Sequence, residues 1–239
     1  MRQQMFNSLE LTGRASTHVR EAPELGCILH HDALAQARAM QAAARSAGIE
    51  LAIVSSFRPF DRQVVIWNAK YSGERALNDS NGALLNHADL GENALIDAIL
   101  LWSALPGASR HHWGTDMDVV DRAAVSEDYR PQLIQAEFAA SGPFARLDSW
   151  LADNMGRFGF FRPYTTNRGG VQPEPWHLSY APVAEEALTA LTPEVLSDAL
   201  GGSSMYGREA VLARLAEIYR RYVTAIDPPP VNSSLPRPS

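Results

Sequence analysis

Two short segments of this chain carry residues of the types that bind and use a metal ion. They are residues 109–118 (SRHHWGTDMD) and residues 174–177 (EPWH). Catalytic zinc takes three protein ligands from His, Asp and Glu and keeps a further position for water. The segments supply one such set of ligands, His111, Asp118 and His177. Glu174 lies beside the last of them and could transfer protons, so the chemistry predicted is metal-assisted hydrolysis.

Together the segments resemble the zinc D-Ala-D-Ala carboxypeptidase family of the VanY and LdcB type. The family pattern is S-x-H-x-x-G-x-A-x-D, with E-x-x-H later in the chain and S-x-x-R before it. The matching positions here are Ser109, His111, Gly114, Asp118, Glu174, His177 and the segment Ser55 to Arg58, with Gln63 five residues further on. Asp116 stands where the family usually has alanine. The resemblance covers about residues 50 to 180.

The resemblance implies one zinc ion per chain and hydrolysis of a peptide bond. Glu174 is expected to deprotonate the attacking water and to protonate the leaving amine. Arg58 is expected to stabilise the negative charge that develops on the carbonyl oxygen. Ser109, Gln63 and Ser56 are expected to contact the substrate, the first two at its terminal carboxylate or the neighbouring amide.

Other polar and aromatic residues near these motifs are harder to assign. Asp116 shares a strand face with Asp118, so it should lie beside the metal. There it either orients a histidine ligand, which we favour, or pairs with a cation such as Arg110. Trp176 is expected to pack around the ligands and, like Trp113, to be a pocket wall or part of the core. His112 is expected to point away from the metal, with substrate contact as the alternative, and His18, His30, His31 and His87 are expected to be core or surface residues.

Hydrophobic periodicity and end signals predict the elements that position these residues. Helices are expected over 32–47 with Asp32 as the cap, 61–70 with Asp61 as the cap, 90–105, 149–157, 183–191, 193–200 and 208–223. Strands are expected over 49–55, 115–121 and 176–180, with an extended segment from Phe160 and a loop over 163–173. Gly114 should turn the chain so that His111 returns to Asp118. Pro175 disfavours helix at Glu174, so we expect extended chain to present Glu174 and His177.

Composition sets further limits. The formal charge is −6 and there is no basic cluster, which argues against a nucleic-acid partner. The longest apolar run, 94–105, is too short to span a membrane. No leader sequence is visible, so we expect a cytoplasmic protein, with secretion that needs no leader as the alternative. Cys27 is the only cysteine, which excludes a cysteine-rich zinc finger or ribbon.

The fold that the resemblance implies is α+β and hedgehog/DD-peptidase-like, with a mostly antiparallel sheet carrying the zinc site and helices packed around it. We expect one domain over residues 1–226 and a disordered proline-rich tail over 227–239. The expected activity is release of terminal D-alanine from a peptidoglycan stem peptide or muropeptide. A cytoplasmic enzyme would meet imported fragments, so we favour L,D-carboxypeptidase action on tetrapeptides. D,D-carboxypeptidase action on pentapeptides, a lysin-type endopeptidase and a zinc-bearing module without turnover remain open, as does the oligomeric state.

Overall fold

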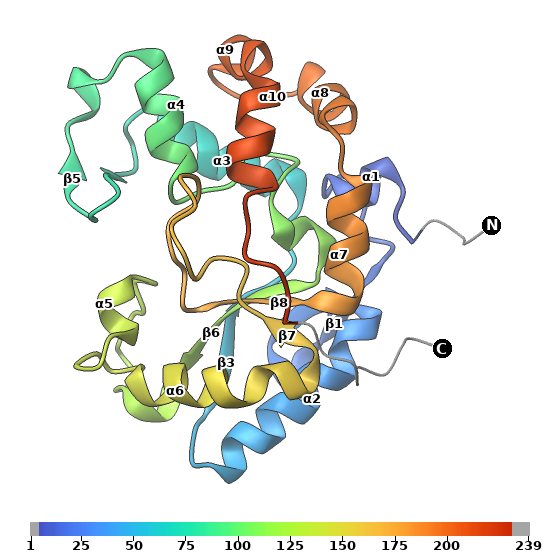
Figure 1. Cartoon of the computed structure of the whole chain (residues 1–239), viewed down its shortest axis with the longest axis vertical. Helices are drawn as coiled ribbons and strands as arrows, with labels where there is room; N and C mark the ends of the chain where they lie inside the picture. The colour runs from blue at the N-terminus through green and yellow to red at the C-terminus, as the bar shows by residue number, and fades with distance from the viewer. Residues whose placement is uncertain (1–4, 231–239) are drawn as a thin grey trace.

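The centre of the molecule is a four-stranded antiparallel sheet in a computed structural model that describes residues 5–230. Its strand order is β3 (Leu51–Ser55), β6 (Asp116–Asp121), β8 (His177–Tyr180) and β7 (Phe160–Phe161). The chain is therefore α+β with an antiparallel sheet, as the sequence predicts. Helices lie both above and below this sheet (Figure 1).

The register of this sheet brings distant parts of the sequence together. Every residue of β6 is buried, and strands pair with it on both sides. Asp118 lies opposite His177 on β8 and opposite Ser55 on β3. The register between β3 and β6 shifts between Ile53 and Ser55, at the end of β3 that leads toward Arg58. Pairing alone thus places Ser55, the first residue of the S-x-x-R segment, with Asp118 and His177 at one end of the sheet.

The N-terminal part forms a hairpin and the longest helix. Its elements are α1 (Ser8–Leu11), β1 (Val19–Ala22), η1 (Pro23–Leu25), β2 (Cys27–His30) and α2 (His31–Ser46). β1 and β2 pair antiparallel, and neither is among the strands expected from the sequence. The cap expected for α2 was wrong: the ring of His30 accepts a hydrogen bond from the Asp32 amide at 3.3 Å, and Asp32 lies in the first turn.

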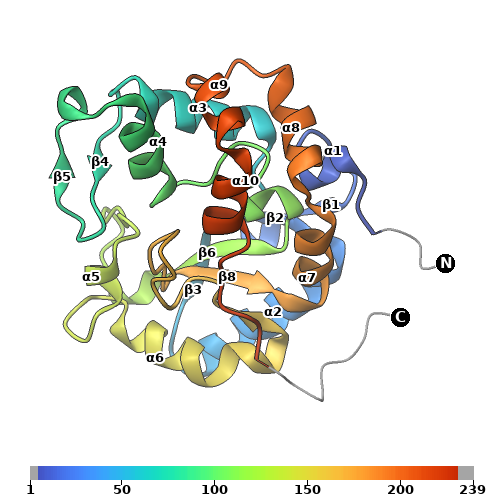
Figure 2. The same ribbon diagram turned by 45° about the horizontal axis from the view of Figure 1, so that its top comes forward.

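A second group of elements covers the upper side of the sheet in Figure 2. It comprises α3 (Phe60–Tyr71), the short pair β4 (Leu77–Asn78) and β5 (Leu84–Leu85), η2 (His87–Asp89) and α4 (Glu92–Leu100). Asp61 lies in the first turn of α3 and does not cap it; the cap position is Pro59. The helix predicted over 90–105 ends early, at Leu100. The carbonyl of Ala104, in the chain beyond this helix, accepts the Gln63 side chain at 2.7 Å.

The remaining elements complete the layers around the sheet. They are η3 (Arg110–Trp113), η4 (Arg122–Ala124), α5 (Gln135–Phe138), α6 (Ala145–Asn154), η5 (Met155–Phe158), α7 (Ala181–Ala190), α8 (Pro193–Gly201), α9 (Arg208–Ala213), α10 (Leu215–Ile218) and η6 (Tyr219–Val223). The single helix predicted over 208–223 is broken at Arg214, which leaves helical geometry (φ −112°, ψ 11°). Its guanidinium bonds to Asp97 and Glu217 and so ties this segment to α4.

Buried apolar side chains form one cluster that includes residues from Phe6 to Val223. The tail was expected to begin at Asp227, but that residue is ordered, with its carboxylate bonded to Thr165, Thr166 and Arg168. The rest of the expected tail, 231–239, lies outside the described residues. Within residues 5–230, no helix has both the length and the apolar character needed to cross a membrane.

Candidate functional site

Three buried side chains converge where β6 and β8 meet the η3 turn. The His111 Nε2 atom lies 3.5 Å from Asp118 Oδ2, and His177 Nδ1 lies 3.3 Å from Asp118 Oδ1. One potential ligand atom from each of the three residues falls within 4.8 Å of the others. Gly114, in left-handed geometry at φ +66°, ends η3 and starts the return to β6, as predicted. The structure therefore brings together all three residues expected to hold the metal.

The hydrogen bonds of the two histidines show which nitrogen each has free. His111 donates from Nδ1 to the Ser56 carbonyl at 3.0 Å, and His177 donates from Nε2 to Asp116 at 2.8 Å. The other nitrogen of each ring faces the Asp118 carboxylate and offers a lone pair to a metal once it is unprotonated. Asp118 Oδ1 is buried and has no hydrogen-bond partner among the described residues. Two nitrogen lone pairs and a carboxylate around one point form a ligand set for a cation. A histidine whose second nitrogen is held by a hydrogen bond is typical of zinc sites.

The protonation states fit this arrangement. Burial lowers the pKa of His111 to about 4, so its ring is neutral near pH 7. Burial also acts to lower the pKa of His177, but hydrogen bonds with Asp116, Asp118 and Glu174 outweigh it and hold the pKa well above the usual value. The space between these groups therefore attracts positive charge, which either a proton or a metal ion can supply.

Glu174 reaches the same point from a tight turn. The His177 amide donates to the Glu174 carbonyl at 3.1 Å, so the chain turns back between them rather than running extended as predicted. This turn brings Glu174 Oε2 to 3.3 Å from His177 Nδ1, and 13% of the Glu174 side chain stays exposed to the pocket. Burial raises the pKa of Glu174, which suits a group that must accept and return a proton.

Asp116 performs both of the tasks considered for it. One carboxylate oxygen accepts from His177 and from the Arg110 Nε at 2.8 Å, and the other accepts from Thr115 and Ser179. The guanidinium of Arg110 also lies over the Trp113 ring, 4.8 Å from its centroid. This buried network fixes the orientation of the His177 ring.

Arg58 lines the pocket, whereas two residues expected to contact substrate beside it do not. Arg58 donates to Gln63 Oε1 and to Ser55 Oγ, both at 3.0 Å. Gln63 is fully buried, because its amide is held between Arg58 and the Ala104 carbonyl. The Ser56 hydroxyl accepts a hydrogen bond from the Ile28 amide, and the Ser56 carbonyl accepts one from His111. The structure thus places Gln63 behind Arg58 and Ser56 behind His111 rather than at the substrate.

The remaining expected residues separate into pocket wall and scaffold. Ser109 and Trp176 line the pocket. His112 does not, because its ring is buried between the Arg58 carbonyl and the Gly107 amide. Trp113 is fully buried and donates to the Leu11 carbonyl.

Of the other histidines, His18 and His30 are buried, and His87 donates to the Tyr71 carbonyl. His31 has 53% of its side chain exposed. His30, His31 and Asp32 also lie close enough together to be a second potential metal group. The His30 Nδ1 lone pair in that group is already occupied by the Asp32 amide, which leaves it a poor ligand set.

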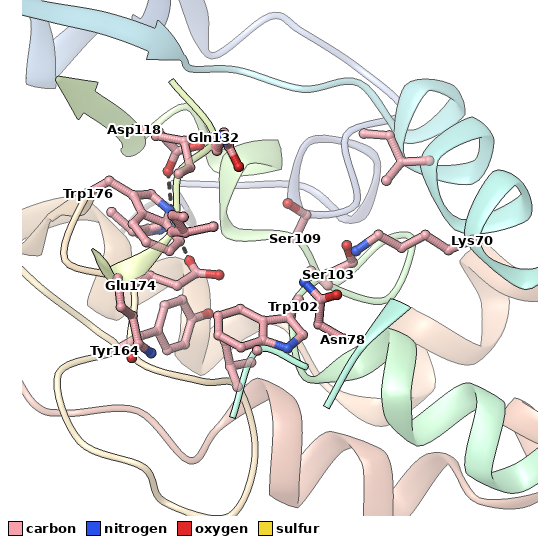
Figure 3. A pocket seen from close by; sticks show the side chains of 18 of the residues that line it. Lys70, Asn78, Trp102, Ser103, Ser109, Asp118, Gln132, Tyr164, Glu174 and Trp176 are labelled. Atoms are coloured by element: carbon pink, nitrogen blue, oxygen red, sulfur yellow. Dashed lines mark ion pairs between the residues drawn. The ribbon is translucent and has the colours of Figure 1, made fainter. Parts of the chain in front are cut away.

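The metal centre opens into a cavity of about 860 Å³. Its walls include residues that the sequence analysis did not single out: Lys70, Arg75, Asn78, Trp102, Ser103, Gln132 to Ala136 and Tyr164. In Figure 3, Glu174, Asp118, Trp176 and Tyr164 lie on one side of the cavity and Lys70, Asn78, Ser103 and Ser109 on the other. The motifs contain no signal for these positions, because they come from α3, β4, α5 and loops outside the patterns.

Comparison with known proteins gives the same family as the motifs. Residues 26–183 match the model of a family described as VanY: D-alanyl-D-alanine carboxypeptidase. An uncharacterized protein of Haemophilus influenzae is 35% identical over 121 residues, which are 50% of this chain and 92% of that protein. A D-alanyl-D-alanine carboxypeptidase of Enterococcus faecalis is 28% identical over 155 residues, 62% of this chain and 46% of that protein. The solved structure of VanYB in complex with D-alanine-D-alanine is 22% identical, with a TM-score of 0.49, over 78% of this chain and 89% of that one.

Proposed function

Because the chain belongs to the VanY family of D-alanyl-D-alanine carboxypeptidases, we propose that it is a zinc-dependent hydrolase that releases terminal D-alanine from peptidoglycan stem peptides. The observation that carries this is the convergence of His111, Asp118 and His177, with a carboxylate of Glu174 3.3 Å from one ligand nitrogen. The family supports the reaction class, and the donor set supports zinc.

The side chains around the centre have separate tasks in this reaction. His111, Asp118 and His177 would hold zinc, which would supply a Lewis acid for the scissile carbonyl and lower the pKa of a water. Glu174 accepts the proton of the attacking water and returns it to the leaving amine nitrogen. Arg58, held by Gln63 and Ser55, donates to the carbonyl oxygen as negative charge builds on it. Because the site is partly buried, the interactions of Glu174 and of Arg58 with the reacting groups are stronger than they would be in water.

Within this reaction class, we retain the bond preference expected from the sequence. The favoured bond is the L,D bond that precedes the last D-alanine of a tetrapeptide. The alternative is the D,D bond of a pentapeptide. Both substrates end in a D-alanine with a free carboxylate, so the same metal centre and the same cavity serve either one.

The test is turnover of purified, zinc-loaded protein on tri-, tetra- and pentapeptide muropeptides, with product masses read by mass spectrometry. We expect loss of one alanine from the tetrapeptide and no change in the tripeptide. Faster loss of one alanine from the pentapeptide would establish the D,D preference instead. Cleavage inside cross-linked peptides without loss of alanine would assign an endopeptidase, and no cleavage of any substrate would contradict the proposal.

A further inference from the structure

Two of the cations that line the cavity, Lys70 and Arg75, have no task in the reaction described above, and of the two Lys70 is partly buried whereas Arg75 is exposed. Lys70 is the only lysine among the 21 lysine and arginine residues of the chain. It lies in the last turn of α3, is partly buried and lines the cavity. Its ammonium group makes no hydrogen bond or ion pair with the residues that the structure describes, 5–230. Because burying a charge without a partner costs free energy, an unpaired ammonium in a cavity is a binding group for an anion.

The neutral donors beside Lys70 fit the same kind of ligand. Ser109 is 1% exposed and lies two residues before the ligand His111. The side chains of Ser109, Ser103 and Asn78 line the cavity and form no hydrogen bond within the described part of the chain. In Figure 3, Lys70 and Glu174 extend into the cavity from opposite sides, with Ser103 and Ser109 on the Lys70 side. One cation and several free donors facing one space make a site for a carboxylate.

We propose that Lys70 binds the free α-carboxylate at the C-terminus of the substrate, next to Ser109, for which the family resemblance already implies this contact, and thereby makes the enzyme an exopeptidase. This inference rests on the proposed function, since it concerns the substrate of that site. A scissile carbonyl at the metal centre has the terminal carboxylate only one residue further along the peptide. Glu174 occupies one side of the centre, which leaves the Lys70 side for that carboxylate.

The same residue explains why a longer chain would be rejected. In an endopeptidase substrate, a neutral peptide group replaces the terminal carboxylate. Lys70 would then lose water without gaining a charged partner, and a site built for a polar group discriminates strongly against a ligand that lacks it. Lys70 is therefore a specificity-determining residue, and its removal should affect substrates with a free C-terminus selectively.

The main test compares a stem peptide that has a free C-terminal carboxylate with the same peptide as a C-terminal amide, which leaves any side-chain carboxylate intact. For the natural protein we expect kcat/KM to be at least about 100-fold higher for the free acid. In Lys70→Met, the value for the acid should fall about 10- to 100-fold, mainly through KM, and the value for the amide should stay the same. Lys70→Arg should keep much of the preference, since it retains the charge.

The matched control is Arg45→Met, which removes an exposed cation from the last turn of another helix, α2. It should leave both substrates unaffected. An equal loss for acid and amide in Lys70→Met, or no loss for either, would overturn the inference. A preference that persisted in Lys70→Met would assign carboxylate binding to other groups and would overturn it as well.

A binding measurement separates this inference from the proposed function. Because Lys70 is the only lysine, protein labelled with ¹³C,¹⁵N-lysine gives one lysine side-chain signal in an NMR spectrum. That signal should shift and saturate as D-alanine is added, and should not respond to D-alaninamide. A specific shift without turnover of any muropeptide would support the carboxylate site while removing the proposed function. Turnover without a shift would support the proposed function and overturn the carboxylate site.

Discussion

At the scale of single residues, the hydrogen bond made by one ring nitrogen of each histidine determines which other nitrogen can bind a metal. His177 depends on a carboxylate, because its Nε2 donates to Asp116, whereas His111 depends on the backbone carbonyl of Ser56. A carboxylate partner makes a histidine a stronger donor to a metal than a neutral partner does. The position where the family usually has alanine therefore carries a residue that acts directly on one ligand.

We predict that Asp116→Asn weakens zinc binding about 10- to 100-fold, the usual effect of losing such a partner. The substitution keeps the shape of the side chain but removes the charge that faces His177 and Arg110. Competition with a chromophoric chelator measures the affinity, and circular dichroism checks the fold. Ser179→Ala is the control, since it removes a neighbour of Asp116 and leaves the carboxylate. Equal zinc affinity in the natural protein and Asp116→Asn would contradict the role given to Asp116.

Proton transfer and metal binding should be separable at Glu174 and His177. We predict that Glu174→Gln retains zinc and loses turnover by about 10² to 10⁴ fold, because it removes only the group that moves the proton. His177→Ala should lose both zinc and turnover, since a ligand is gone. Zinc content by elemental analysis, read against turnover, gives the comparison. An active Glu174→Gln protein would rule out the mechanism and leave the metal site intact.

At the scale of elements, the short turns carry more of the site than the helices do. The Glu174–His177 turn and the η3 turn each end next to a strand of the central sheet, and the sheet register fixes the ligands they deliver. The loop that precedes Glu174 has its own attachment. Asp227, beyond the last helical turn, accepts hydrogen bonds from Thr165, Thr166 and Arg168.

We predict that Asp227→Asn lowers the free energy of unfolding by about 1 to 3 kcal/mol, the range for partly buried hydrogen bonds to a charged group. Burial acts to raise the pKa of Asp227, but the bonds from Thr165, Thr166 and Arg168 outweigh it and hold the pKa far below its usual value. A depressed carboxyl pKa stabilises the fold above the unfolded value, about 3.9, and the stabilisation is lost as pH falls below it. The difference in Tm between the two proteins should therefore be full at pH 7 and shrink below about pH 4. A constant difference would contradict this linkage.

The same comparison of elements shows what the sequence could predict. The ligand positions follow from motif spacing, β6 follows from alternation, and β3 follows from a short apolar run. Gln63 was misassigned because a motif gives neighbours along the chain but not direction: α3 turns its side chain inward, onto Arg58 and Ala104. Lys70 and Tyr164 could not be found, because their proximity to Glu174 depends on how α3 and the loop after β7 fold over the sheet.

At the scale of the whole molecule, the distribution of charge matters more than its sum. The chain carries a formal charge of −6, yet the side chains that line the cavity include Arg58, Lys70, Arg75 and Arg110 against only Asp118 and Glu174 as acids. An acidic protein with a locally cationic cavity can attract a small anionic peptide into that cavity. The two walls then divide the work, with proton transfer on the side of Glu174 and recognition of the carboxylate on the side of Lys70.

This division predicts how substrate binding depends on pH. The pKa of Lys70 is lowered to about 8, mainly by burial. The charge of Glu174 acts to raise this pKa, and the charge of Arg75 acts to lower it. Lys70 is therefore cationic below about pH 8 and loses its charge above that value. We expect KM for a free-acid peptide to be flat between pH 6.5 and 7.5 and to rise about tenfold per pH unit well above the pKa. Lys70→Arg should remove this rise, because arginine stays protonated, and the C-terminal amide should not show it in either protein. The measurement is steady-state kinetics from pH 6.5 to 10 for the natural protein and Lys70→Arg, each with the free-acid peptide and the C-terminal amide. A rise in KM that persisted unchanged in Lys70→Arg would assign the titration to a group other than Lys70.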